Sequence, residues 1–248
     1  MKKLAIITYT VISVIYFGSC TNNSTKQQVP LSSNESTDSA KISGIPCDVT
    51  ISGIHFTKSI NDAVSNISIN DNKITFTSGK ETDYFSDPNG KLSNTTAPLL
   101  LTNIDNSKPF TFTAKVTPQF TEDGTYNAGV LYVYVNDSFF QKHCFEQDER
   151  GKHRVVTVRT EGTSDDSNHD IVEQGYVYMK ISSDTRTIAS YYSLDNKNWQ
   201  MVRLYKNNYP SEIWLGISNQ CPMREGSQSL FEELNLELKS VSEFRMGI

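Results

Sequence analysis

The sequence predicts an all-β protein, a jelly-roll sandwich of two antiparallel sheets. Apolar and polar residues alternate with a period of two in many short segments beyond about residue 45. Turn residues separate these segments, as in Asp87-Pro88-Asn89-Gly90 and Glu122-Asp123-Gly124. No stretch after residue 20 carries a sustained amphipathic helical pattern. Many short strands of this kind form a sandwich or a barrel, and about 200 residues suit one two-sheet jelly roll.

The expected strands follow one another along the chain. Segments 66–69 and 73–77 flank Asn70-Asp71-Asn72, which is a hairpin signal. Segment 110–116 alternates cleanly and stops at Pro118. Further strands are expected at residues 129–135, 155–160, 176–181, 187–193, 199–204, 213–218 and 234–238.

The strand at 129–135 has two different faces. Aliphatic residues occupy one face, and the other carries Val130, Tyr132 and Tyr134. Tyrosine rings on a sheet can stack on the apolar C–H face of a sugar while their hydroxyl groups bind its rim. Tyrosine also tolerates any half-buried sheet face. The sequence alone leaves both interpretations open.

The N-terminus predicts export and a lipid anchor. Lys2 and Lys3 precede an apolar run, residues 4–17, that is too short to span a membrane with its flanks. The run ends in Phe17-Gly18-Ser19-Cys20, which resembles a bacterial lipobox. We therefore expect a signal peptide at 1–19 and a lipid on Cys20 that holds the protein in the cell envelope, at the periplasmic or surface face of the outer membrane. The alternative is a secreted protein with an incidental cysteine.

The next segment predicts a tether. Thirteen of the twenty residues from 21 to 40 are Ser, Thr, Asn or Gln, and none is aromatic. Such a composition cannot bury enough apolar surface to offset the entropy of ordering. We therefore divide the chain into a signal peptide (1–19), a lipidated cysteine with a polar tether (20–43) and one β-sandwich domain (44–248).

Charge and cysteine content exclude several classes of protein. The 248 residues carry a net charge of −5; loss of Lys2 and Lys3 lowers Lys plus Arg from 23 to 21 against 28 acids, giving −7. This balance argues against a nucleic-acid partner. With Cys20 lipidated, the remaining thiols can form at most one disulfide, and they lack zinc-binding spacing. These thiols are Cys47, Cys144 and Cys221.

Four groups of residues match a known family in order and spacing. They are Thr82-Asp83-Tyr84-Phe85 with Ala97-Pro98 and 110–112; Ala128-Gly129-Val130-Leu131 with Lys142 and Glu146; 155–158 with Ser164-Asp165; and Tyr192-Ser193, Asp195, Trp199, Arg203, Gly216-Ile217, Gln220 and Pro222. Together they resemble the domain of unknown function 1349 family, over about residues 51–238. The resemblance implies a concanavalin A-like jelly roll and, for some members, an accessory role in polysaccharide use.

A candidate ligand site follows from strand geometry. Lys142, Cys144 and Glu146 share one face of a strand, and His143 and Phe145 point to the other. We expect a polar cleft on the concave sheet that binds carbohydrate, or else a structural ion-pair network. Alanine at Lys142 or Glu146 should then abolish binding and leave the melting temperature nearly unchanged. Partly on the resemblance, the predicted ligand-binding set also includes Asp83, Tyr84, Tyr132, Ser164, Asp165, Tyr192, Arg203 and Gln220.

Two other function classes stay open, a glycan-active enzyme and a protein-interaction module. Hydrolysis needs two carboxyls at a defined separation. Glu146 is followed by Asp148 and Glu149, but alternation places Glu149 on the opposite face, and 147–151 reads as a turn. Lys142 or His143 keeps a lyase mechanism open. We assign no catalytic residue.

No cofactor or metal ligand is assigned from the sequence. Segment 163–168 is rich in oxygen ligands of the kind that Ca²⁺ prefers, so a structural calcium is an open alternative to a plain turn. The four histidines, His55, His143, His153 and His169, show no ligand spacing.

Overall fold

The computed structural model describes residues 43–248, and the predicted signal peptide, Cys20 and almost all of the tether lie outside the described residues. The described part is an all-β sandwich of antiparallel sheets, which confirms the predicted fold class. Its strands are β1 (Ile45–Ile51), β2 (Ile54–Ile60), β3 (Ile67–Asn70), β4 (Lys73–Gly79), β5 (Tyr84–Ser86), β6 (Ser93–Thr95), β7 (Leu99–Asp105), β8 (Phe110–Pro118), β9 (Ala128–Asn136), β10 (Phe139–Gln147), β11 (His153–Glu161), β12 (Thr163–Ile171), β13 (Val177–Ser183), β14 (Thr187–Ser193), β15 (Trp199–Lys206), β16 (Glu212–Gln220) and β17 (Gly226–Glu237).

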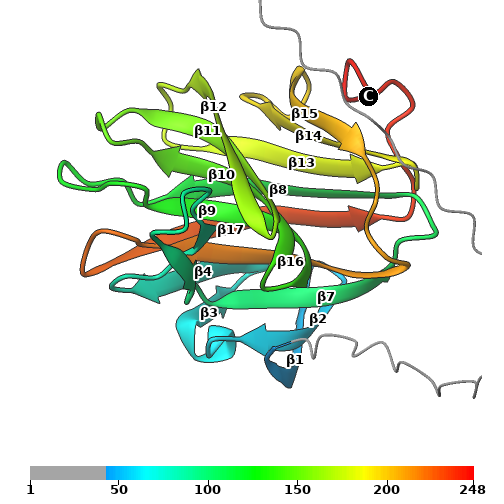
Figure 1. Cartoon of the computed structure of the whole chain (residues 1–248). Helices are drawn as coiled ribbons and strands as arrows, with labels where there is room; N and C mark the ends of the chain where they lie inside the picture. The colour runs from blue at the N-terminus through cyan, green and yellow to red at the C-terminus, as the bar shows by residue number, and fades with distance from the viewer. Residues whose placement is uncertain (1–42) are drawn as a thin grey trace, which may run out of the picture. The chain divides into compact units, whose positions relative to one another are not determined.

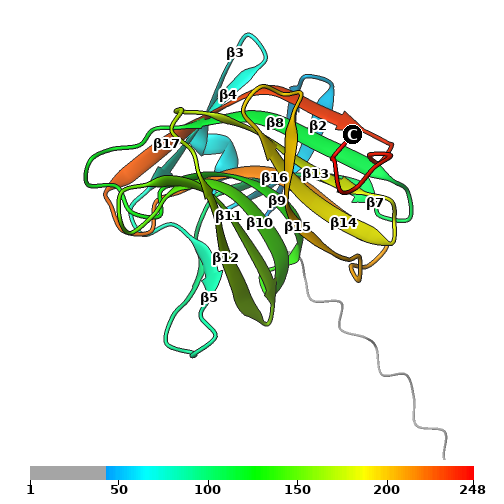
Figure 2. The ribbon, with the colours of Figure 1, turned by 90° about the horizontal axis from the view of Figure 1, so that it is seen from above.

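The strands form two large layers and one small hairpin. The eight-stranded sheet has the order β1-β2-β7-β16-β9-β10-β11-β12, and the seven-stranded sheet has the order β15-β14-β13-β8-β17-β4-β3. The two layers face each other in Figures 1 and 2. Strands β5 and β6 pair only with each other, and β5 lies beside β12 on the outer side of the eight-stranded sheet (Figure 2).

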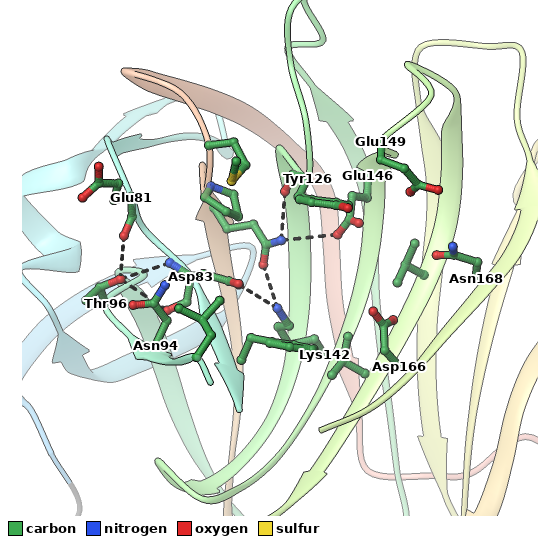
Figure 3. A pocket seen from close by; sticks show the side chains of 17 residues that line it. Glu81, Asp83, Asn94, Thr96, Tyr126, Lys142, Glu146, Glu149, Asp166 and Asn168 are labelled. Atoms are coloured by element: carbon green, nitrogen blue, oxygen red, sulfur yellow. Dashed lines mark hydrogen bonds and ion pairs between the residues drawn. The ribbon is translucent and has the colours of Figure 1, made fainter. Parts of the chain in front are cut away.

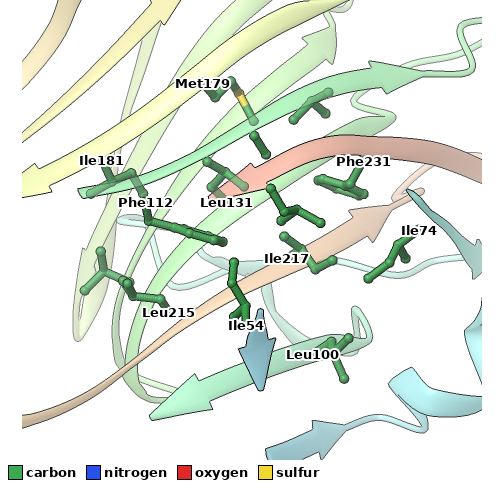
Figure 4. Packing of buried hydrophobic residues seen from close by; sticks show 14 of the residues in the cluster. Ile54, Ile74, Leu100, Phe112, Leu131, Met179, Ile181, Leu215, Ile217 and Phe231 are labelled. Atoms are coloured by element: carbon green, nitrogen blue, oxygen red, sulfur yellow. The ribbon is translucent and has the colours of Figure 1, made fainter. Parts of the chain in front are cut away.

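The main core lies between the two large sheets (Figure 4). Leu131 and Ile217 point inward from the eight-stranded sheet, and they meet Phe112 and Phe231 from the seven-stranded sheet. Every second residue of β9, β10 and β16 therefore points away from this core, because side chains alternate along a strand. Three of these outward residues, Lys142 and Glu146 of β10 and Gln220 of β16, form the floor of the site described below.

Local sequence signals explain the hairpin and one strand end, but they miss several strands. Asp71 and Asn72 adopt positive φ angles of 46° and 61°, as the two-residue turn between β3 and β4 requires. Strand β8 ends at Pro118 as predicted. The alternating pattern does not predict β1, β2, β5, β6, β7 and β12, and β17 begins eight residues before the predicted 234–238.

The helical content of residues 43–248 is small. It comprises the short 3-10 helix η1 (Ala63–Asn66). None of the helices in this part of the chain is long and apolar enough to cross a membrane.

Gly216 is required where β16 packs on β7. A Cβ atom at this position would lie 2.3 Å from Leu101 Cδ2 and 2.7 Å from the Leu100 carbonyl oxygen. We expect Gly216→Ala to lower the free energy of unfolding by about 1–3 kcal/mol, because the backbone must shift to admit the methyl group. Urea denaturation measures this loss. Gly79→Ala is the control, since nothing lies within 4 Å of its Cβ position, and equal effects of the two variants would contradict the packing argument.

Candidate functional site

A pocket of about 900 Å³ opens on the outer face of the eight-stranded sheet (Figure 3). Its floor comes from β10 and β16, one wall from β11 and β12, and the other wall from the chain around β5 and β6. Its lining residues are Glu81, Asp83, Phe85, Leu92, Asn94, Thr96, Tyr126, Lys142, Glu146, Glu149, Val156, Val158, Asp166, Asn168, Gln220, Pro222 and Met223.

Strand β10 places Lys142 and Glu146 together, as alternation predicted. Both side chains line the pocket, whereas Phe145 packs in the core between the sheets. Lys142 Nζ donates hydrogen bonds to Asp83 Oδ1 at 2.9 Å and to Gln220 Oε1 at 3.0 Å. Gln220 Nε2 in turn donates to Glu146 Oε2 at 3.3 Å and to the Tyr126 carbonyl at 2.9 Å. A continuous polar chain therefore crosses the floor.

The ion pair fixes the protonation state of Lys142. Only 2% of the Lys142 side chain is exposed, and burial by itself lowers the pKa of the ammonium group. The nearby charge of Asp83, assisted by the hydrogen bond between them, outweighs this effect, so the pKa lies above its ordinary value. The ion pair with Asp83 therefore favours the charged form of Lys142.

Two carboxyls on the other side of the floor have the opposite character. Burial raises the pKa of Glu146 well above its ordinary value, and the charge of Asp166 adds to the shift while Lys142 opposes it. Loss of water around the pocket wall also raises the pKa of Asp166, even though its residue surface is exposed. Both carboxyls hold protons more tightly than free carboxyls do, and the protonated form of a carboxyl can donate as well as accept a hydrogen bond.

Asp83 is held in place by the segment around the small hairpin. Its carbonyl accepts hydrogen bonds from the amides of Thr96 and Ala97, at 2.8 and 3.1 Å. Its carboxylate accepts a further bond from the Tyr84 amide at 2.8 Å. A bridge between Thr82 and Cys221 ties the same segment to the end of β16. These bonds make the wall of the pocket a fixed part of the fold.

Tyr126 lies at the rim in a strained backbone conformation. Its φ angle is 62°, in the left-handed region that bulky residues rarely adopt, and 37% of its surface is exposed. Its amide donates to the Gln147 carbonyl at 2.6 Å, and its own carbonyl receives the bond from Gln220. Strain of this kind persists where surrounding bonds enforce it, and such positions cluster at binding sites.

The structure brings four of the ten predicted ligand-binding residues into the pocket: Asp83, Lys142, Glu146 and Gln220. Tyr84 and Tyr132 are completely buried and pack edge-to-face at 6.2 Å, and Tyr134 packs beside them. The tyrosines on this face are therefore covered by the β5 segment and cannot act as an open stacking platform. Tyr84 instead donates a hydrogen bond to Asp137.

The other four predicted residues serve neighbouring strands. Ser164 accepts a hydrogen bond from the Ser86 amide at 2.9 Å and so joins β12 to β5. Asp165 points away from the pocket and pairs with Arg203 at 3.3 Å, at the edge between the two sheets. Tyr192 donates to Asp170 at 2.7 Å. None of these four lines the pocket.

Sequence reasoning missed Tyr126, Glu149, Asp166 and Asn168, which all line the pocket. Alternation predicts that Glu149 lies on the opposite face from Glu146, but both residues line the same pocket. A turn that starts at Asp148, whose carboxylate accepts from the Arg150 amide, interrupts the alternation and returns Glu149 to the pocket. Asp166 lies opposite Val158 of β11 in the sheet, and no signal in the polar sequence of β12 indicates this pairing.

The oxygen-rich segment 163–168 is part of strand β12 rather than a turn or a loop. Its side chains therefore alternate between the two faces and do not converge on one point. Within residues 43–248, no group of three or more His, Cys, Asp or Glu side chains is placed to hold a metal ion. In the same part of the chain Cys47, Cys144 and Cys221 are free thiols.

A family model described as protein of unknown function (DUF1349) matches residues 61–239. The chain belongs to the DUF1349 family. No curated protein matches the sequence closely enough to count as a relative.

Solved structures share the fold of this DUF1349 protein. A functionally unknown protein from Saccharomyces cerevisiae superposes with a TM-score of 0.67 and 19% identity, covering 74% of this chain and 96% of its own. The GH43 protein BlXynB from Bacillus licheniformis, in a mutant form, has a TM-score of 0.58 and 14% identity, covering 78% of this chain and 38% of its own. The Xyloglucan PUL GH43B of Bacteroides ovatus covers 77% of this chain and 38% of its own, with a TM-score of 0.51 and 12% identity. These likenesses concern the fold alone, and this chain spans little more than a third of each of the two GH43 chains.

Proposed function

We propose that this DUF1349 protein binds carbohydrate in the pocket on the outer face of its eight-stranded sheet. The observation that carries the proposal is the polar chain Lys142–Gln220–Glu146 on the floor of a pocket with Tyr126 at its rim. Sugar hydroxyls are both donors and acceptors, so they suit a floor that presents an ammonium, an amide and a carboxyl. The exposed Tyr126 ring supplies a surface for the apolar face of a sugar.

We further propose that the domain works in the cell envelope, held by lipid at Cys20, as an accessory to polysaccharide use. The support is the lipobox-like Phe17-Gly18-Ser19-Cys20 after an apolar run. Likeness of fold to GH43 proteins is compatible with this role. Metabolic labelling with a radioactive fatty acid tests the anchor, since Cys20→Ala should then remove the label.

Glycan binding is tested with residues 21–248 on a glycan array, followed by calorimetry on the ligands found. We expect Tyr126→Ala and Glu146→Gln to weaken binding at least tenfold, because each removes a group that faces the pocket. Tyr176→Ala is a matched control, since this tyrosine packs against Lys115 of the seven-stranded sheet. Unchanged affinity in both pocket variants would contradict the proposal.

A glycan-active enzyme is the second candidate, favoured by one observation. Glu146, Glu149 and Asp166 face the same pocket, and the raised pKa of Glu146 suits a proton donor. Incubation with the glycan found on the array discriminates the two functions. New reducing ends that disappear in Glu146→Gln would show catalysis, and binding without products would show a carbohydrate-binding domain.

A further inference from the structure

We propose that the ligand of this pocket carries a positive charge, and that its chemical class is a glycan containing an amino sugar with a free amine. The inference rests on the proposed carbohydrate-binding function. The geometry that supports it is a pocket in which two carboxyls of the described residues have no protein cation within ion-pair distance, while the single lysine is already paired with Asp83.

The charges that line the pocket are unequal. Five carboxyl residues and one lysine line it. Three of the carboxyls have a cation within ion-pair distance: Asp83 has Lys142 at 2.9 Å, Glu81 has Lys80 at 3.8 Å, and Glu149 has Arg150. Glu146 and Asp166 have no Lys, Arg or His partner within 4.0 Å among residues 43–248.

Glu146 lies deep in the pocket. Its residue is 7% exposed, and its hydrogen bond from Gln220 is a long one of 3.3 Å. Figure 3 shows its carboxyl on the floor next to Tyr126, with Asp166 on the adjacent wall. Burial is the main cause of the raised pKa of Glu146; the charge of Asp166 raises it further, and the charge of Lys142 lowers it. The charged form of a buried carboxyl is costly without a cation in contact, so a bound cation would stabilise that form of Glu146.

An ammonium group satisfies this arrangement better than a neutral or acidic group does. It would bring a cation into the pocket that these carboxyls line, and its three N–H donors form strong hydrogen bonds to carboxyl groups in a site with reduced water. A uronic acid or a sulfate would meet five carboxyls, and the one lysine that could attract it is held by Asp83. A hexosamine presents its ammonium on the same ring whose C–H face can cover Tyr126.

The experiment uses residues 21–248 and four tetrasaccharides at neutral pH and low ionic strength. Three share a β-1,4-linked glucose backbone and differ only at C2, which bears an amine, an acetamide or a hydroxyl; the fourth is an acidic oligogalacturonate. We expect the amine form to bind at least tenfold more tightly than the acetamide and hydroxyl forms, and the acidic form to bind most weakly. The preference for the amine should decrease with added salt.

Matched variants locate the effect. Asp166→Asn and Glu146→Gln keep the shape and remove one charge each, so each should reduce the amine preference at least fivefold. Asp165→Asn removes a charge from the next residue of β12, which points away from the pocket, and it should leave the preference unchanged.

The outcomes separate this inference from the proposed function. Equal or tighter binding of an uncharged or acidic glycan, or an amine preference that survives in Asp166→Asn and Glu146→Gln, overturns the amino-sugar assignment while carbohydrate binding stands. Absence of binding by any glycan on the array overturns the proposed function, and the assignment with it. Amine preference lost in the two pocket variants and kept in Asp165→Asn supports both.

Discussion

Replacing Lys142 with methionine is expected to lower the free energy of unfolding by about 3–5 kcal/mol. The substitution leaves the Asp83 carboxylate, in a residue that is 8% exposed, without its cation. Removing one partner of a buried ion pair is strongly destabilising, because the other charge remains away from water without compensation. Chemical denaturation of residues 21–248 measures the loss.

Two comparisons make this prediction specific to the buried pair. Lys108→Met removes a lysine that is 65% exposed and 3.3 Å from Asp105, and it should cost less than about 1 kcal/mol. Lys142→Met combined with Asp83→Asn should cost less than the sum of the two single losses, since the double variant leaves no buried charge of this pair unpaired. A loss for Lys142→Met similar to that for Lys108→Met would show that the pair does not support the fold.

Because Lys142 is buried, loss of binding in a Lys142 variant can result from a loss of stability. From sequence we expected alanine at Lys142 to abolish binding with little effect on the melting temperature, because the side chain was placed in a solvent-accessible cleft. The ion pair with Asp83 makes this residue structural as well. Lost binding in a Lys142 variant therefore does not identify a ligand contact, whereas Glu146→Gln and Tyr126→Ala leave the ion pair intact.

Alternation along single strands could be predicted from the sequence, and contacts between distant segments could not. The period of two predicts that Lys142 and Glu146 share one face of β10 and that Phe145 lies on the other, since that geometry is local to the strand. The structure places the first two in the pocket and Phe145 in the core. The covering of Tyr132 by the β5 segment depends on a hairpin far away in sequence. Nothing in the alternating pattern distinguishes a covered tyrosine from an open one.

Polar composition and turns explain the other differences. Strand β12 lies at the edge of its sheet and is rich in Asp, Ser, Thr and Asn, so it lacks the hydrophobic pattern on which strand prediction depends. Asp165 belongs to the predicted set through the family resemblance, whereas its neighbour Asp166 is the residue that lines the pocket. The turn after Gln147 breaks the alternation and brings Glu149 to the pocket. The pairing of the polar edge strand and the course of this turn become visible only in the folded structure.

The second large effect is expected from pH, through His143. This residue is completely buried between the sheets, and its Nε2 atom lies 2.8 Å from the Tyr191 carbonyl oxygen. Burial lowers the pKa of His143 to about 4, and the neighbouring His169 acts in the same direction. An unfolded histidine has a pKa near 6.5. Between these two values the unfolded chain therefore binds a proton that the folded chain does not.

The sign of the effect follows from this difference. Because the unfolded state binds more protons, the free energy of unfolding rises with pH in this range, and it is lost as the pH falls from about 6.5 towards 4. The slope approaches about 1.4 kcal/mol per pH unit, and the total for His143 is about 3 kcal/mol. Denaturation curves measured across this range should show the loss.

Comparison with His143→Gln isolates this contribution. Glutamine can donate a hydrogen bond to the Tyr191 carbonyl but does not titrate, so the variant should lose less stability than the wild type on acidification. Glu146 and Asp166 contribute with the opposite sign, because their raised pKa values let the folded state bind protons first, and they act equally in both proteins. His55→Gln, at a side chain that is 57% exposed, should follow the wild-type curve. If His143→Gln followed it too, His143 would not be the group whose neutral form the folded sandwich requires.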